Sequence, residues 1–260
     1  MKKMNEYDIV NNQYKDTSNL DIRIMIHKKY STNKMGFANW IYSNYKFNPE
    51  MKILELGCGT GDMWKENLNV LNGAKILLTD FSEAMVNTAK NNLKEQKDIE
   101  YNIVNIEEIP YFNNEFDRVI ANMMLYHVPN IPKALSEVSR VLKYDGYFYC
   151  ATYGENTILS NIAKLIEVDL KENDWIFTLQ NGNDILKPYF KEVKRLDYVD
   201  SLEITEIDDL IDYIESLKGM HEIFKMDKST LKERLTSKMK NGILTIPKEY
   251  GMFVCKKEFF

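Results

Sequence analysis

The feature that most constrains this chain is a short hydrophobic run followed by a turn with glycine at every second position. The run Ile53–Leu56 is typical of a buried parallel strand, and Gly57, Gly59 and Gly61 form the turn. Glycine adopts positive φ at little cost and leaves room for a ligand against the backbone. Residues from Asp62 onward have helical character, so we expect the turn to lead into a helix. This arrangement holds nucleotide-like ligands at the carboxyl edge of a parallel sheet.

The glycine spacing separates two classes of cofactor. Dinucleotide folds use G-x-G-x-x-G, whereas this turn reads G-x-G-x-G and follows the acidic Glu55. The run resembles the first motif, E/D-x-G-x-G-x-G, of class I S-adenosylmethionine (SAM) dependent methyltransferases. In that family Glu55 would either fix the turn or accept hydrogen bonds from the amino-acid end of SAM. The resemblance implies cofactor contacts by five residues of this segment: Glu55, Gly57, Cys58, Gly59 and Gly61.

A second acidic position lies at the end of the next predicted strand. The run Ala74–Thr79 ends at Asp80, roughly 20 residues beyond the glycine turn, where an acidic side chain can bind both ribose hydroxyls. Ser82 is placed to cap the following helix. Phe81 is expected either against the adenine face or in the core.

The third predicted strand, Glu100–Val104, ends at Asn105. In the family this position usually carries Asp, which binds the adenine amino group, and the backbone of the next residue, here Ile106, contacts the ring. The amide oxygen of Asn105 can accept the same hydrogen bond without the charge. The resemblance therefore adds Asn105 and Ile106 to the cofactor site.

The segment Phe116–Pro129 resembles the fourth strand and following loop of the small-molecule branch called the methyltransferase type 11 group. Asn122 is expected to contact the methionine part of the cofactor or to hold the loop. His127 titrates near neutrality when unperturbed, so it is a candidate catalytic base or a donor that positions substrate. Tyr126 is comparable, and the alternative for both residues is a role in structuring the loop.

The resemblance implies an α/β fold, a doubly wound and mostly parallel sheet of seven strands in the order 3-2-1-4-5-7-6. The last strand, about Ile243–Lys256, should run antiparallel beside the fifth, Tyr147–Thr152, and residues 191–199 should form the sixth. We expect an N-terminal helical cap at 1–48 and a SAM-binding domain at 49–260, with a helical substrate-cap insertion at about 155–242. Expected outside the common core are helices at Leu20–Tyr30, Met35–Tyr45, Thr157–Lys171, Ile207–Leu217 and Ser229–Lys240, and an extra strand at Trp175–Leu179; within the core a helix is expected at Ala134–Leu142.

Composition narrows the function further. The net charge of −5 argues against a nucleic-acid substrate, which usually requires a basic face. No run is long enough to span a membrane and the start lacks the core of a signal peptide. The three cysteines, Cys58, Cys150 and Cys255, are widely spaced, and the three histidines show no zinc-ligand spacing. We therefore expect a cytoplasmic protein with reduced thiols, no metal and no membrane or nucleic-acid partner; the oligomeric state stays open.

These features predict a SAM-dependent methyltransferase that transfers a methyl group to a small molecule by in-line displacement and releases S-adenosylhomocysteine (SAH). The acceptor atom stays open among oxygen, nitrogen, carbon and sulfur. A non-catalytic SAM-binding or SAH-binding protein is the alternative, whereas an NAD-dependent oxidoreductase would need the longer glycine spacing. Four aromatic residues are candidates for lining the substrate pocket: Tyr30, Trp40, Trp64 and Trp175.

Overall fold

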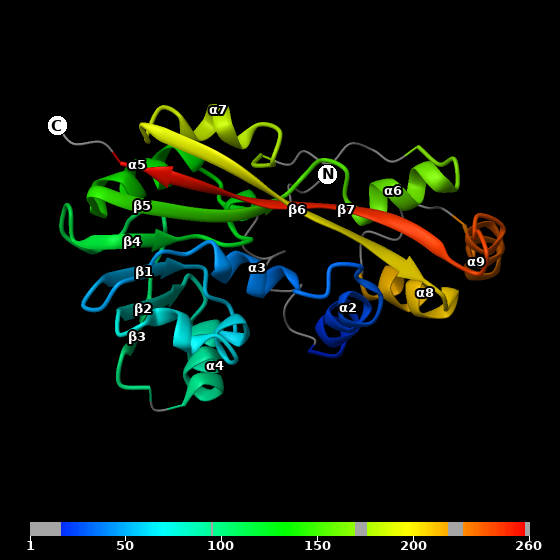
Figure 1. Cartoon of the computed structure of the whole chain (residues 1–260), viewed down its shortest axis with the longest axis horizontal. Coiled ribbons are helices and arrows are strands. Elements are labelled where there is room, and N and C mark those ends of the chain that lie inside the picture. The colour runs from blue at the N-terminus through cyan, green and yellow to red at the C-terminus, as the bar shows by residue number, and fades with distance from the viewer. Residues whose placement is uncertain (1–16, 95, 170–175, 218–225, 258–260) are drawn as a thin grey trace. The chain divides into compact units, whose positions relative to one another are not determined.

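The computed structural model of this chain describes residues 17–94, 96–169, 176–217 and 226–257. These residues include a sheet of seven strands in the order β3-β2-β1-β4-β5-β7-β6 (Figure 1). The predicted fold and strand order are therefore confirmed. The strands are β1 Lys52–Leu56, β2 Lys75–Asp80, β3 Ile99–Ile103, β4 Phe116–Ile120, β5 Leu142–Tyr153, β6 Glu192–Ile204 and β7 Leu244–Lys256.

Strands β1 to β5 pair in parallel. Strand β7 runs antiparallel to β5, because the N–H of Gly154 donates to the carbonyl of Glu249 at 2.7 Å while that of Lys257 donates to Gly146 at 3.1 Å. The chain therefore reverses its direction beside the fifth strand, as the sequence predicted. In this topology the carboxyl ends of β1, β2 and β4 lie at one edge of the sheet, where ligands of open α/β sheets bind.

The chain divides into two compact units, and β6 and β7 contribute residues to both. Unit 1 comprises Met1–Gly36, Tyr153–Trp175 and Tyr198–Tyr250. Unit 2 comprises Phe37–Thr152, Ile176–Asp197 and Gly251–Phe260. The domain boundaries stay a prediction: an N-terminal cap at 1–48, a main domain at 49–260 and an insertion at about 155–242.

Within the described residues, unit 2 contains strands β1 to β4, most of β5 and four α-helices. In β1 and in β4 four of the five residues are buried, as expected for strands that are covered on both faces. The hydroxyl of Ser82 accepts the N–H of Met85 and caps α4, as predicted. The buried residues of α5 recur every three or four positions, which is the period of a helix packed on one face. The helices are α3 Phe37–Ser43, α4 Glu83–Leu93, α5 Ile131–Val141 and α7 Gly182–Leu186.

Two predictions for unit 2 are wrong. The glycine turn does not lead into an α-helix but into two short 3₁₀ segments, Asp62–Trp64 and Leu68–Leu71. Asparagine competes with helical hydrogen bonding, and Asn72 ends the second segment in the left-handed conformation with φ +50°. The expected extra strand is also absent from residues 176–179, because Asn181 and Thr178 bond within a local turn there. Trp175 lies outside the described residues.

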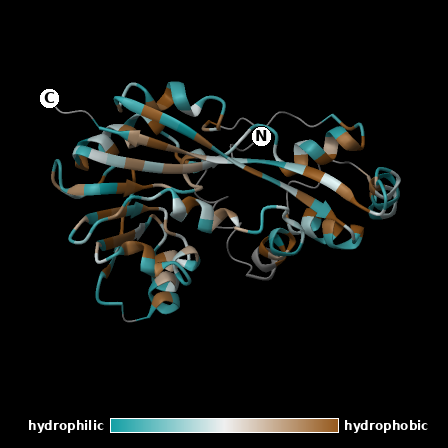
Figure 2. Ribbon diagram, in the orientation of Figure 1, coloured by the Kyte–Doolittle hydropathy of each residue, from teal (hydrophilic) through white to brown (hydrophobic). Residues whose placement is uncertain are grey.

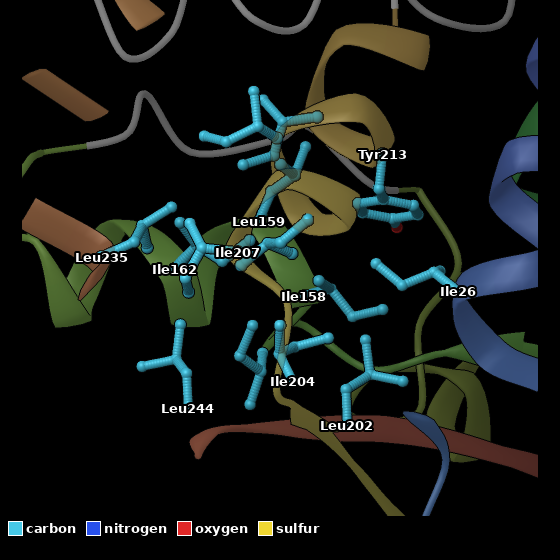
Figure 3. Packing of buried hydrophobic residues seen from close by; sticks show 14 of the residues in the cluster. Ile26, Ile158, Leu159, Ile162, Leu202, Ile204, Ile207, Tyr213, Leu235 and Leu244 are labelled. Atoms are coloured by element: carbon cyan, nitrogen blue, oxygen red, sulfur yellow. The ribbon is translucent and has the colours of Figure 1, made fainter. Parts of the chain in front are cut away.

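Unit 1 has its own hydrophobic core beside the ends of β6 and β7. Ile207 of α8 packs in one cluster with Ile162 of α6 and Leu235 of α9 (Figure 3). The side chains of Thr157 and Asp227 cap α6 and α9 by accepting backbone N–H groups of the first turn. The helices are α2 Thr17–Tyr30, α6 Ile158–Leu165, α8 Ile207–Ser216 and α9 Lys228–Ser237.

Hydrophobic and hydrophilic residues are distributed differently between the regular elements and the loops. Figure 2 shows hydrophobic residues along the strands and on the helices, and hydrophilic residues in many of the loops. Among the described helices, none combines the length and the apolar character that crossing a bilayer requires.

Candidate active site

The candidate site lies in unit 2 and begins with the glycine turn after β1. Gly57, Gly59 and Gly61 all have positive φ, at +74°, +56° and +70°. A side chain at any of these positions would be strained, so the sequence requirement for glycine is a backbone requirement first. The three glycines differ, however, in what lies beside them.

Only Gly59 faces open space. A Cβ added to it would have no heavy atom within 4 Å, whereas one added to Gly57 would lie 2.9 Å from Cγ of Met124. A Cβ on Gly61 would lie 3.0 Å from Cδ1 of Leu93 and 3.2 Å from Cβ of Ala89, both on α4. Gly57 and Gly61 therefore allow protein segments to pack closely, and Gly59 is the glycine beside which a ligand has room.

Asp80 joins β2 to the glycine turn. Its carboxylate accepts the N–H of Gly59 at 3.0 Å and the N–H of Ser82 at 2.8 Å. Burial raises the pKa of Asp80, and these backbone donors lower it in part. Because a carboxylate has about four lone-pair positions, acceptor capacity remains for a further donor. Asp80 is thus held in place by the protein and still able to bind a hydroxyl group.

Cys58 provides a second connection between the turn and β2. Its N–H donates to the carbonyl of Thr79 at 2.8 Å, and its thiol points to the carbonyl of Gly59 at 3.6 Å. Burial raises the pKa of the Cys58 thiol, with a contribution from the nearby Glu55 carboxylate. The thiol therefore stays protonated and unreactive, and Cys58 belongs to the site through its backbone.

Glu55 is almost fully buried, with 4% of its surface exposed, and it accepts a hydrogen bond of 2.5 Å from the indole Nε1 of Trp64. Burial raises the pKa of Glu55 to about 7; the bond from Trp64 opposes this shift and the charge of Asp80 adds to it. Trp64 is itself only 1% exposed and packs against the ring of Tyr42, whose centroid lies 4.8 Å away. Glu55 therefore fixes the segment after the glycine turn through Trp64.

Asn122 follows β4 and is 7% exposed. Its Nδ2 donates to the hydroxyl of Tyr45 at 2.5 Å, but its Oδ1 is buried and has no partner within the described part of the chain. Buried polar atoms are rarely left unpaired, so Oδ1 of Asn122 is suited to accept a donor from a ligand. Met123, the next residue, has φ +54°. Backbone strain of this kind in a residue other than glycine often marks functional loops.

The predicted adenine-binding residues lie at the ends of β2 and β3. Oδ1 of Asn105 accepts the N–H of Glu107 at 3.0 Å, which uses one of its two lone pairs for a local turn. Ile106 is buried, whereas Phe81 is 47% exposed. Phe81 is therefore partly exposed at the sheet edge, and Asn105 retains one acceptor position.

Tyr126 and His127 lie together in a short 3₁₀ segment, Leu125–His127. Their ring centroids are 4.5 Å apart in an edge arrangement, and the N–H of His127 donates to the carbonyl of Met124 at 2.9 Å. Tyr126 is buried and His127 is half-buried. The contact of Met124 with Gly57 brings this loop against the glycine turn.

Sequence reasoning missed the contribution of the segment around α3. Tyr45 bonds to Asn122 and Tyr42 packs on Trp64, so this segment contacts two parts of the candidate site. The helical spacing of aromatic residues was visible in the sequence, but nothing local indicated their partners. Of the other candidate pocket residues, Trp40 stacks on Phe37 at 5.8 Å, and Tyr30 belongs to unit 1.

The described residues contain no cluster of three potential metal ligands. An apolar groove lies elsewhere in unit 2 and includes none of the predicted site residues. It is lined by Pro129, Ile131, Pro132, Ile176, Asp184, Ile185, Pro188 and Tyr189.

The strand order, the acidic residues at two neighbouring strand ends and the glycine turn define the class I methyltransferase fold. The profile of the family described as "Methyltransferase domain" matches residues 47–194, which is more than half of the chain. This chain belongs to that family.

Individual relatives agree with this classification. The chain is 33% identical over 115 residues to the ubiquinone/menaquinone biosynthesis C-methyltransferase UbiE of Rickettsia prowazekii, an alignment that covers 42% of this chain and 46% of the relative. It is 32% identical over 144 residues to the demethylmenaquinone methyltransferase of Lactococcus lactis, covering 48% and 57%. The chain spans about half the length of the curated relatives it matches.

Among solved structures, phosphoethanolamine N-methyltransferase 2 of Haemonchus contortus, in complex with phosphomonomethylethanolamine and SAH, has a TM-score of 0.62. The match covers 100% of this chain and 61% of the other at 15% identity. At this level of identity the similarity shows the fold alone, and the chemistry has to be argued from the site.

Proposed function

We propose that this chain is a SAM-dependent methyltransferase that acts on a small-molecule acceptor. One observation carries the proposal. The carboxylates of Glu55 and Asp80, at the ends of two neighbouring strands, border a glycine turn in which Gly59 faces open space. An acidic, glycine-lined edge of this kind suits a ligand with hydroxyl groups and a cationic amino-acid end rather than a pyrophosphate.

The residues present fit SAM at each end of the molecule. Asp80 has acceptor capacity left for a ribose hydroxyl, and Phe81, which is partly exposed, can contact the adenine together with Asn105 and Ile106. The unpartnered Oδ1 of Asn122 can accept a hydrogen bond from the amino group of the methionine part. The backbone at Gly59 supplies the close approach, and Gly57, Cys58 and Gly61 hold that backbone in place.

When bound, SAM supplies a methyl group on a sulfonium ion, which an acceptor displaces in line. The residues of this chain have to hold both reactants and exclude water, and such alignment can lower a barrier by roughly 7–11 kcal/mol. Where the acceptor carries a proton, His127 or Tyr126 would accept it or orient the acceptor, and general-base catalysis typically adds about 10²–10⁴-fold. The acceptor atom itself stays open.

Two further parts of the proposal rest on composition. The net charge of −5 favours a small acceptor over nucleic acid. The three free cysteines in the described residues, two of them buried, fit a reducing compartment, and we place the protein in the cytoplasm. Cell fractionation with an antibody to the chain would test the location, and recovery in the membrane pellet would contradict it.

The cofactor is tested by thermal unfolding with and without SAH. At 100-fold excess over its Kd the ligand should stabilise the folded chain by about 2.7 kcal/mol, which is on the order of 5–10 °C for a chain of this size. NADH at the same concentration should cause no shift. A shift with NADH and none with SAH would refute the assignment of the cofactor.

Catalysis needs its own measurement, because a protein that only binds SAM would pass the first test. SAM labelled in the methyl group should be incubated with the protein and a low-molecular-mass cell extract, followed by detection of labelled small products. Transfer should disappear when His127→Ala and Tyr126→Phe are combined if these residues act on the acceptor. Binding of SAH without transfer to any fraction would favour the non-catalytic alternative.

A further inference from the structure

Unit 1 contains a second group of polar side chains, which the cofactor site does not use. Arg23 and His27 lie one helical turn apart on α2, on the side that packs against α8. Nη2 of Arg23 donates to the carbonyl of Ser216 at 3.0 Å, and the ring of His27 meets that of Tyr213 edge-on at 6.3 Å. The two side chains therefore point to the same side of α2, toward the same helix.

Each of these two side chains has a buried nitrogen without a partner. Within the described residues, neither Nε of Arg23 nor Nδ1 of His27 makes a hydrogen bond. The large majority of buried side-chain polar atoms in folded proteins have a hydrogen-bond partner. Two unpaired nitrogens at adjacent turns of one helix face are therefore a signal for a ligand that supplies hydrogen-bonding groups at both.

Tyrosine rings lie around the ring of His27. The ring of Tyr250 lies 6.0 Å from that of His27, and the ring of Tyr153 lies 5.1 Å from that of Tyr250. Burial lowers the pKa of His27 to about 3, and the charge of Lys248 adds to this effect. His27 is therefore neutral and can donate one hydrogen bond or accept one according to its tautomer, while each phenol carries a hydroxyl donor.

The balance of charge decides the class of ligand. Lys248 is paired with Asp200, and the two side chains are 2% and 0% exposed. The ammonium of Lys248 also bonds to the hydroxyl of Ser31 at 2.9 Å. This pair is therefore neutral overall, whereas Arg23 has no carboxylate partner among the described residues. Counted over the described residues, the group thus has one more positive than negative charge, which disfavours a cationic ligand and favours an anion.

We propose that Arg23, His27 and Tyr213 form a site in unit 1 that binds a small anion, a carboxylate or a phosphate. The guanidinium has a planar set of donors that matches both anions. This inference does not depend on the proposed methyltransferase function.

The test uses the full chain saturated with SAH and two probes, inorganic phosphate and acetate, in separate calorimetric titrations. Wild type should bind at least one probe with a Kd in roughly the millimolar range. Arg23→Gln should weaken that binding at least tenfold, because one charge and its hydrogen bonds are lost (~tenfold per lost bond, or more). The matched control is Lys29→Gln, which removes a charge from the exposed pair with Asp209 on the same helix and should leave the Kd within about twofold.

A measurement on the wild type tests the proposal even if Arg23→Gln does not fold. The chain has three histidines, so the imidazole nitrogens of His27 can be assigned by nuclear magnetic resonance, and the bound probe should shift them. The probe with the lower Kd, phosphate or acetate, shows whether the site prefers a phosphate or a carboxylate. Binding of tetramethylammonium instead of either anion, unchanged affinity in Arg23→Gln, or no effect on His27 would each overturn the proposal.

The affinity for SAH separates this proposal from the proposed methyltransferase function. Arg23→Gln and wild type should bind SAH equally, because the cofactor residues belong to unit 2. If SAH does not bind but phosphate binding depends on Arg23, the anion site stands and the methyltransferase proposal fails. If SAH binds and neither anion does at concentrations far above the millimolar range, the anion site alone is refuted.

Discussion

At the scale of single residues, Asp80 makes the clearest prediction about the cofactor. Asp80→Ala removes the acceptor for a ribose hydroxyl and the bond to Gly59 that orients the turn. Hydrogen bonds to a charged group contribute about 1.5–3 kcal/mol each, so the affinity for SAH should fall by about 10- to 100-fold or more. Calorimetric titration with SAH measures this change. The exposed Asp184→Ala in the same unit is the control, and equal affinity in both variants would remove Asp80 from the site.

Glu55 predicts a pH dependence of stability. Its pKa is about 7 in the folded protein against a usual value of 4.5, so between these pH values the folded chain holds a proton that the unfolded chain has released. The free energy of unfolding therefore falls as the pH rises through this window, and the contribution is fully present only below pH 4.5.

Glu55→Gln keeps the acceptor for Trp64 without the ionisation. Between pH 5 and 8 wild type should lose on the order of 2–3 kcal/mol relative to this variant, measured by urea unfolding at both pH values. Glu233→Gln, an exposed change on α9, should follow the wild type. A constant difference between wild type and Glu55→Gln across this range would mean that Glu55 is ionised in the folded protein throughout.

At the scale of elements, the packing of the loop after β4 on the glycine turn predicts different roles for two glycines. Gly57→Ala combines positive φ with a Cβ 2.9 Å from Cγ of Met124, so it should destabilise the fold by about 1–3 kcal/mol. Met124→Ala in the same chain should recover part of this loss. Gly59→Ala meets no atom and should cost about 1 kcal/mol for its backbone strain alone.

Gly57→Ala should be the less stable of the two glycine variants, whereas Gly59→Ala should have the lower affinity for SAH. Gly59→Ala fills the space beside the turn and should weaken SAH more than Gly57→Ala does once both are folded. Denaturant unfolding and SAH titration on the same samples separate the two effects. If Gly57→Ala were as stable as wild type, or Gly59→Ala bound SAH normally, the division of roles between the glycines would be wrong.

Some of these elements could be predicted from the sequence, and others could not. Strands β1 and β2 were predictable because each is a mostly hydrophobic run that ends at a glycine turn or at an acidic residue, and β4 was predictable from the resemblance to the family. The 3₁₀ path after Asp62 was not, because it depends on Trp64 reaching Glu55, a contact between elements. The bond of Tyr45 to Asn122 joins residues 77 positions apart, and no local pattern indicates such a pairing.

At the scale of the whole molecule, each proposed site belongs to one unit, and this separation can be measured by hydrogen exchange. SAH should slow the exchange of amides around residues 55–61, 80–82 and 122–127, all in unit 2, because a ligand suppresses the local openings of the segments it contacts. At labelling times of seconds to minutes, amides of α8 and α9 in unit 1 should change little. Inorganic phosphate should give the converse pattern, with slower exchange in α2 and α8.

The expected exchange pattern requires each unit to open locally without the other, although β6 and β7 contribute residues to both units. Protection by SAH that extended equally into α8 and α9 at short times would mean that the units open together, and binding at one site would then stabilise the other. Asp80→Ala is the control, since loss of cofactor binding should abolish the protection in unit 2. In Arg23→Gln, phosphate protection of α2 should disappear while SAH protection persists, because the two ligands would be bound by residues of different units.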